Sequence, residues 1–281
     1  MIPGTNGSAR LLAHELGTRG YVTLRYDKLG TGAADKPAKL PITIDDVEAE
    51  PQAALALLHG RPDVDPAHVF VAGHSEGGIY AVRLAAKARA QIAGLLLLSS
   101  APKPIKDVLL DQLTKLGHAQ AKQAGIADSV VDAQLAPIRA DLDAFFAGKD
   151  IDPMKYATLP VIAAIVNPAS ASMVRVLYAY DPAAALATLR GLPILVVSGG
   201  KDVQVPAEDG ARLATAAKQG GADVTAVVAP DADHVLKHEA KPRDALDPGV
   251  EGRAYNAAGR ALDPVALDAI VRFLADHTTK R

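Results

Sequence analysis

Short apolar runs alternate with amphipathic stretches along most of the chain. The runs are rich in leucine and β-branched side chains, and they are bounded by Gly, Pro, Asp or Ser. Because nearly every position in them is apolar, they predict strands that are buried on both faces, as in a parallel sheet. We expect these strands at residues 21–27, 69–73, 93–100, 193–200 and 225–230.

The stretches between these runs place apolar residues at helical spacing. They predict crossover helices over residues 8–20, 45–60, 77–90 and 207–221. Strands that alternate with helices in this way are typical of a doubly wound α/β fold with a mostly parallel sheet.

Residues 103–190 break the alternation, because they carry no convincing strand pattern. Their apolar spacing predicts one helix from about Ile105 and a second helix between Asp128 and Gly148. An insertion of this length is too long for a plain crossover, so it predicts a helical lid. We therefore expect three segments along the chain: a first part of the α/β core at 1–102, the lid at 103–190 and the second part of the core at 191–281.

Composition narrows the function classes. The formal net charge is -2, and aromatic residues make up 4% of the chain with no Trp, which argues against a nucleic-acid partner. The absence of Cys excludes a thiol nucleophile, a disulfide scaffold and a thiolate metal site. No apolar run approaches the roughly 20 residues of a membrane span, and the first residues do not resemble a signal peptide. As written, the sequence predicts a cytoplasmic protein without a membrane span.

The stretch Gly73-His74-Ser75-Glu76-Gly77 fits the pattern G-x-S-x-G, between a predicted strand and a predicted helix. In that context the motif predicts a tight turn that exposes the serine hydroxyl above the sheet. The backbone N–H of Glu76 would then face a developing oxyanion. A serine that merely caps the helix is the alternative, and the flanking strand and helix favour the nucleophile.

A serine hydroxyl needs a general base to act as a nucleophile. In this fold the acid and the histidine follow the serine along the chain. His234 lies just after a late strand and is the expected base, with His238 in reserve. Asp202 directly follows the strand at 193–200 and is the acid expected to orient the imidazole of His234.

Other acids and histidines near these positions have simpler interpretations. Asp231 and Asp233 lie on the loop of His234 itself, where Asp is typical of turns. The remaining histidines are expected to be surface or core residues: His14, His59, His68, His74, His118 and His277.

Several stretches resemble the α/β-hydrolases, and most of all the bacterial esterase and serine-aminopeptidase-like branch with a helical cap. They are RYDKLGTG at 25–32, GHSEGG at 73–78, LPILVVSGGKDVQVP at 192–206 and PDADHVLK at 230–237. The resemblance implies a triad of Ser75, Asp202 and His234, with the Glu76 N–H as one oxyanion donor. It implies no cofactor and no metal.

The chain departs from that family at its start. Family members place three strands before the one that corresponds to 21–27, whereas the first helix here begins within about ten residues. Three explanations stay open: the sequence begins after those strands, the sheet is reduced, or another chain supplies a strand. The stretch Pro3-Gly4-Thr5-Asn6-Gly7 is a candidate source of the second oxyanion donor.

The leading functional hypothesis is hydrolysis of a small-molecule carboxylic ester through an acyl-enzyme. An aminopeptidase, a thioesterase or a lactonase with the same triad remains an alternative, as does a non-catalytic ligand-binding homologue. The oligomeric state stays open. Apolar residues and Tyr156, Tyr178 and Tyr180 in the lid are candidates for an acyl pocket, although packing between lid helices explains them equally well. The lid acids have the period of a solvated helix face: Asp128, Asp132, Asp141 and Asp143.

Overall fold

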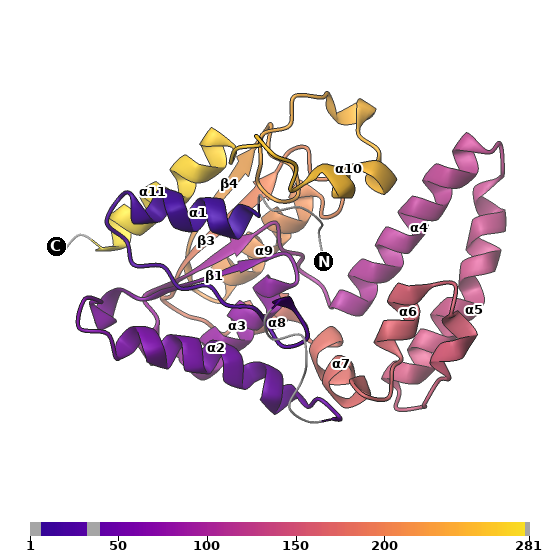
Figure 1. Ribbon diagram of the computed structural model, residues 1–281, viewed down its shortest axis with the longest axis horizontal. Coiled ribbons are helices and arrows are strands. Elements are labelled where there is room, and N and C mark those ends of the chain that lie inside the picture. Colours follow the sequence, from indigo (N-terminus) through magenta and orange to yellow (C-terminus); the bar gives the residue numbers. More distant parts are fainter. Residues whose placement is uncertain (1–6, 33–39, 279–281) are drawn as a thin grey trace. The chain divides into compact units, whose positions relative to one another are not determined.

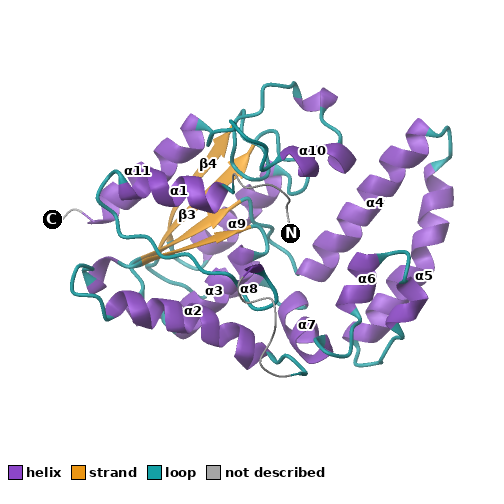
Figure 2. Cartoon of the chain, viewed as in Figure 1, coloured by secondary structure: helices purple, strands orange, loops and turns teal. Residues whose placement is uncertain are grey.

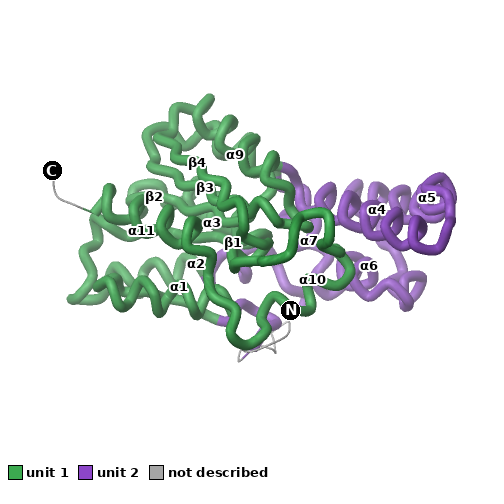
Figure 3. The backbone as a smooth tube through the Cα atoms, turned by 90° about the horizontal axis from the view of Figure 1, so that it is seen from above, with its two compact units in different colours: residues 1–26, 51–102, 181–281 green, residues 27–50, 103–180 purple. Residues whose placement is uncertain are grey.

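The computed structural model describes residues 7–32 and 40–278 of the chain (Figure 1). These residues form two compact units, which Figure 3 shows in separate colours. The first unit comprises the residues up to Tyr26 together with 51–102 and 181–281, and the second comprises 27–50 and 103–180. The boundary near Pro51 falls inside a helix, α2 (Ile44–His59).

A parallel sheet forms the centre of the first unit. Among the described residues it has four strands: β1 (Phe70–His74), β2 (Gly94–Leu98), β3 (Pro193–Gly199) and β4 (Asp223–Ala229). Their order in the sheet follows their order in the chain, β1-β2-β3-β4, and every neighbouring pair is parallel. All five residues of β2 are buried, as its uninterrupted leucines predict. All four carboxyl ends therefore lie at one edge of the sheet.

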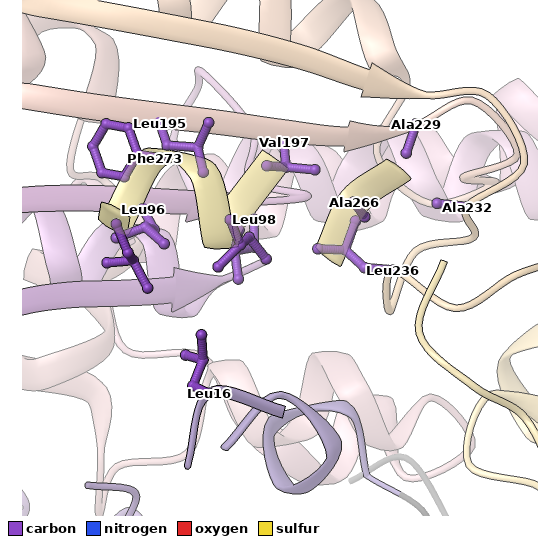
Figure 4. Packing of buried hydrophobic residues seen from close by; sticks show 12 residues of the cluster. Leu16, Leu96, Leu98, Leu195, Val197, Ala229, Ala232, Leu236, Ala266 and Phe273 are labelled. Carbon is purple, nitrogen blue, oxygen red and sulfur yellow. The ribbon is translucent and has the colours of Figure 1, made fainter. Parts of the chain in front are cut away.

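Helices cover both faces of this sheet. On one face Leu96, Leu98 and Leu195 pack with Phe273 of the C-terminal helix (Figure 4). On the other face the backbone of Gly78 approaches Leu97. Because side chains alternate along a strand, the even and odd positions of β2 serve different faces, which gives the doubly wound arrangement. The α-helices that lie wholly in this unit are α1 (Ser8–Gly17), α3 (Gly77–Lys87), α8 (Pro182–Leu186), α9 (Ala207–Gln219), α10 (Pro248–Ala254) and α11 (Pro264–Thr278).

The predicted strand at 21–27 is wrong for this structure. Residues 21–28 belong to no helix or strand, and no backbone hydrogen bond joins residues 22–25 to other described residues. Val22 and Leu24 are 43% and 37% exposed. A cavity of about 380 Å³ lies against this segment and is also lined by Phe70 and Ala72 of β1. An apolar run forms a strand only when a neighbouring strand supplies hydrogen-bond partners, and the cavity occupies that place.

The edge of β1 that faces away from β2 is unpaired within the described residues. The Val69 carbonyl accepts from Ala93 N–H at 2.7 Å, and Ser75 N–H donates to the Leu98 carbonyl at 2.8 Å. Alternate residues of a strand direct their backbone groups to opposite sides. The N–H and C=O of Phe70, Ala72 and His74 therefore face the open edge. Ala72 is exposed although it lies mid-strand.

The unpaired edge of β1 should be detectable by amide hydrogen exchange. The Ala72 amide should exchange at least tenfold faster than the Leu96 amide, because Leu96 lies in a strand with partners on both sides. Amide exchange followed by mass spectrometry or NMR at neutral pH measures the difference. Equal protection of the two amides would show that another segment or a second copy covers the edge in solution.

The second unit contains helices and loops but no strand among its described residues (Figure 2). Its core includes Leu142, Phe145, Ile162 and Val174. The helices predicted from about Ile105 and after Asp128 are confirmed, although Asp128 is the first helical residue and Ala127 occupies the capping position before it. Its α-helices besides the first part of α2 are α4 (Ile105–Gln123), α5 (Asp128–Phe146), α6 (Pro160–Ile165) and α7 (Ala171–Tyr178). A lid role for these helices stays a prediction.

Single 3-10 turns complete the described secondary structure. They lie at η2 (Pro66–His68), η3 (Arg89–Gln91) and η5 (Arg243–Ala245) in the first unit, and at η4 (Pro153–Tyr156) in the second.

Candidate active site

Ser75 lies on the turn between β1 and α3, in the left-handed backbone region with φ at 52°. This conformation is uncommon for a residue with a side chain. It is held by two backbone hydrogen bonds: Ser75 N–H donates to the Leu98 carbonyl at 2.8 Å, and Gly78 N–H donates to the Ser75 carbonyl at 2.9 Å. The turn thus ties the serine to both the neighbouring strand and the first turn of α3.

The glycine before the turn permits a close approach of two backbone segments. A Cβ atom at Gly73 would collide with the carbonyl of Gly77, whereas a Cβ at Gly77 would meet nothing within 4 Å. The two glycines of the G-x-S-x-G pattern therefore have different roles. No side chain fits at position 73 without a clash, whereas the space at position 77 would accept one.

We expect Gly73→Ala to lower the free energy of unfolding by about 1–3 kcal/mol, because the clash is with rigid backbone. The same shift should displace the turn that carries Ser75. Gly77→Ala is the matched control and should leave the melting temperature nearly unchanged. Thermal unfolding of both variants measures the effect, and an equal loss in the two would contradict it.

Three of the residues singled out from the sequence meet in one hydrogen-bonded chain. The Oγ of Ser75 lies 3.1 Å from Nε2 of His234, and Nδ1 of His234 lies 2.8 Å from Oδ2 of Asp202. His234 and Asp202 are each 2% exposed. The three side chains come from the loops after β1, β4 and β3, which all open at the carboxyl edge of the sheet.

The carboxylate of Asp202 is fixed on its second oxygen. Oδ1 accepts the backbone N–H of Gln204 at 2.7 Å and that of Val205 at 2.9 Å. Such an arrangement satisfies a buried carboxylate and leaves Oδ2 aimed at the imidazole. Asp202 therefore holds Nδ1–H of His234 as a donor, so that Nε2 faces the serine with its lone pair.

Glu76 occupies the N-cap position of α3, directly after the serine. Its side chain accepts a hydrogen bond from the Tyr80 hydroxyl at 3.2 Å. The N-terminus of a helix favours negative charge, so the Glu76 backbone N–H stays the expected donor for an oxyanion beside Ser75. The other candidate source of a donor, residues 3–7, lies outside the described residues except for Gly7.

His74 has a role that the sequence did not indicate. Its Nε2 lies 2.7 Å from the backbone carbonyl oxygen of His234, and the two imidazole rings are 5.0 Å apart between centroids. Burial and the neighbouring His234 lower the pKa of His74 to about 4. His74 is therefore neutral at pH 7, and because a carbonyl can only accept, its proton lies on Nε2.

This lowered pKa predicts how stability depends on pH. His74 stays neutral in the folded protein down to about pH 4, whereas in the unfolded chain it gains a proton below about pH 6.5. The unfolded state thus binds more protons between these values, and stability falls as the pH falls. Between pH 7 and pH 4.5 the wild type should lose about 2 kcal/mol more than His74→Gln. Urea unfolding at each pH measures this, and parallel curves would contradict it.

The remaining candidates do not join the hydrogen-bonded chain. Nδ1 of the reserve histidine, His238, lies 3.4 Å from Oδ2 of Asp263. Asp231 pairs with Lys201 at 2.8 Å. Asp233 accepts the backbone N–H groups of two residues of its own loop, which is the turn role expected for it.

The described residues hold no group of three or more His, Cys, Asp or Glu side chains placed to bind a metal ion. Within the same residues, no helix has both the length and the apolar character needed to cross a membrane.

Two curated proteins resemble the chain in sequence. The esterase EstD of Thermotoga maritima is 26% identical over 206 residues, which are 73% of this chain and 44% of that protein. The proline iminopeptidase of Thermoplasma volcanium is 32% identical over 132 residues, which are 45% of this chain and 43% of that protein. The chain thus spans less than half the length of these relatives.

Solved structures show the same fold at low sequence identity. The monoacylglycerol lipase of Paleococcus ferrophilus superposes with a TM-score of 0.51 at 18% identity, covering 98% of this chain and 92% of its own. The enol-lactonase of Burkholderia xenovorans LB400 gives 0.51 at 21% identity, covering 97% and 88%. The model of the family described as serine aminopeptidase, S33, matches residues 5–241. A family match over most of its length, together with the doubly wound parallel sheet, shows that the chain belongs to the S33 serine aminopeptidase family of the α/β-hydrolase superfamily.

Proposed function

We propose that the protein is a serine hydrolase that cleaves carboxylic esters through an acyl-enzyme. The observation that carries this proposal is the hydrogen-bonded chain Ser75–His234–Asp202, with contacts of 3.1 Å and 2.8 Å. A serine beside an imidazole that is itself oriented by a buried carboxylate is the arrangement that nucleophilic acyl transfer requires.

In the first half of the reaction, Nε2 of His234 takes the proton of Ser75 as Oγ bonds to the carbonyl carbon. The carbonyl oxygen becomes an oxyanion that accepts from the Glu76 N–H. The buried carboxylate of Asp202 stabilises the imidazolium that forms. The tetrahedral intermediate then collapses, the C–O bond to the alcohol breaks, and His234 returns the proton to the leaving oxygen.

In the second half, His234 takes a proton from water as the water oxygen attacks the acyl carbon. Collapse of this second intermediate breaks the bond to Oγ, and the proton passes from His234 to Ser75. The products are a carboxylic acid and an alcohol, and the site returns to its starting state.

Aminopeptidase activity is the second candidate, because the chain is similar to a proline iminopeptidase over part of its length. Such an enzyme needs an acid to bind the substrate's amino group. In the second unit, Asp132 is paired with His118 at 2.9 Å, and Asp141 accepts from the Tyr156 hydroxyl at 2.6 Å. These partners favour a structural role for the two acids. Between the two curated relatives, the likeness to the esterase covers more of the chain, 73% against 45%, and we take ester hydrolysis as the first function to test.

Two assays test the proposal. The first compares kcat/KM for p-nitrophenyl acetate and an aminoacyl naphthylamide, and we expect the ester to be at least tenfold better. The second labels the protein with a fluorophosphonate and locates the adduct by peptide mass spectrometry, which should find it on Ser75. Preference for the naphthylamide would favour the aminopeptidase. A folded protein that neither turns over substrate nor labels would point to ligand binding without catalysis.

A further inference from the structure

The loop that carries His234 has to reach across the sheet. His234 follows β4, whereas Ser75 follows β1, and β2 and β3 lie between these two strands. With neighbouring strands about 4.8 Å apart, the two attachment points are separated by roughly 14 Å. Contact between nucleophile and base therefore depends on how the loop after β4 is fastened.

Two backbone hydrogen bonds hold the loop after β4 on the side away from β1. Lys201 N–H donates to the Ala232 carbonyl at 2.9 Å, and Asp263 N–H donates to the Leu236 carbonyl at 2.9 Å. These bonds join the loop to the end of β3 and to the start of α11. They fix its base and its far end, but neither bond reaches the strand that carries the serine.

His74 supplies the link to β1. Its Nε2–H donates to the carbonyl oxygen of His234 at 2.7 Å, and its side chain is partly buried between the two segments. The bond acts on the backbone of the same residue whose imidazole contacts Ser75. His74 and Ser75 are adjacent in the chain. The hydrogen bond therefore holds the backbone of His234, the expected base, close to the residue that carries the nucleophile.

Resting on the proposed function, we propose that His74 is a positioning residue, which holds His234 at working distance from Ser75 through the hydrogen bond from its Nε2–H to the His234 carbonyl. His74 itself takes no part in proton transfer, since its Nε2 proton is engaged by a carbonyl that cannot ionise. Its effect is on the geometry in which the serine proton is transferred.

Two substitutions of His74 by amide side chains distinguish the effect of its hydrogen bond from the effect of its packing. The side-chain nitrogen of Gln reaches the place of Nε2, whereas that of Asn reaches only the place of Nδ1. His74→Gln should keep at least a third of the wild-type kcat. His74→Asn should lower kcat tenfold to a hundredfold while KM changes less than threefold, because a displacement of about 1 Å between reacting groups has effects of this size. His14→Asn, on the exposed face of α1, is the matched control and should leave kcat unchanged.

The comparison is made on p-nitrophenyl acetate, with the melting temperature of every variant measured alongside. A Gln variant as impaired as the Asn variant, or an Asn variant with wild-type kcat, would overturn the inference. If the wild type hydrolyses the ester and labels at Ser75, either of those results rejects the role of His74 alone. If the wild type does neither, the proposed function fails.

A spectroscopic measurement tests His74 without relying on turnover. In protein labelled with ¹⁵N-histidine, the His74 signals are assigned by their absence in His74→Gln. At pH 7 they should show the neutral tautomer with the proton on Nε2. A neutral ring with its proton on Nδ1 would overturn the inference whether or not the protein is an esterase.

Discussion

Replacement of Ser75 by Ala is expected to lower kcat for p-nitrophenyl esters by about 10⁴–10⁶-fold, which is the range found when a triad serine is removed. The Oγ atom that lies 3.1 Å from Nε2 of His234 is lost, so no acyl-enzyme can form. The remaining rate would come from water that attacks a substrate bound beside the oxyanion donor. Initial rates with wild type and variant at matched protein concentrations measure the change.

The fold should survive this substitution. Ser75 is held by its backbone, through bonds to the Leu98 carbonyl and from Gly78 N–H, and Ala retains both groups. The melting temperature should therefore remain within a few degrees of that of the wild type. A stable Ser75→Ala variant with more than a tenth of the wild-type rate would show that ester cleavage uses another nucleophile.

Asp202→Asn should lower kcat by about 10⁴-fold, for a reason that the hydrogen bonds make specific. Oδ1 of Asp202 accepts two backbone N–H groups, from Gln204 and Val205. The carbonyl oxygen of an Asn side chain would keep those two bonds, so its NH₂ group would face Nδ1 of His234. A donor at that position makes Nδ1 the acceptor and moves the proton to Nε2. The imidazole would then donate to Ser75 and be unable to take its proton.

Asp231→Asn is the matched control for this variant. Asp231 also follows a strand of the sheet, but its carboxylate pairs with Lys201 and is half exposed. The control should retain near-wild-type kcat, and both variants should unfold at temperatures close to that of the wild type. If Asp202→Asn hydrolysed the ester within tenfold of the wild-type rate, the proposed orientation of His234 by Asp202 would be rejected.

The four strands of the described sheet could all be predicted from the sequence, because buried parallel strands are apolar on both faces. The stretch at 21–27 is also predicted as a strand from its apolar and β-branched residues, but no strand pairs with it among the described residues, and pairing is a property of two segments rather than one. Local pattern alone also gave no sign that residues 27–50 belong with 103–180. That association involves long-range contacts, such as Ile42 N–H to the Ala169 carbonyl at 2.8 Å.

The meeting of Ser75, Asp202 and His234 was predictable because each follows a different strand, and parallel strands end at one edge. The contact of His74 was not, since the partner of this side chain at the end of β1 lies on a loop 160 residues away. The nearest sequence signal was a histidine directly before the nucleophile, which by itself indicates neither a partner nor a tautomer.

The order of strands has a consequence for how the chain folds. β1 and β2 are synthesised early, but β2 cannot pair with β3 until much later. β3 begins at Pro193, some 95 residues after Leu98. Closing so long a loop is slow, and during synthesis the wholly apolar β2 stands with one side uncovered. The loop after β4 arrives later still, 159 residues after the serine it contacts. Catalytic competence thus becomes a late event, and recovery of activity on refolding reports completion of the whole sheet.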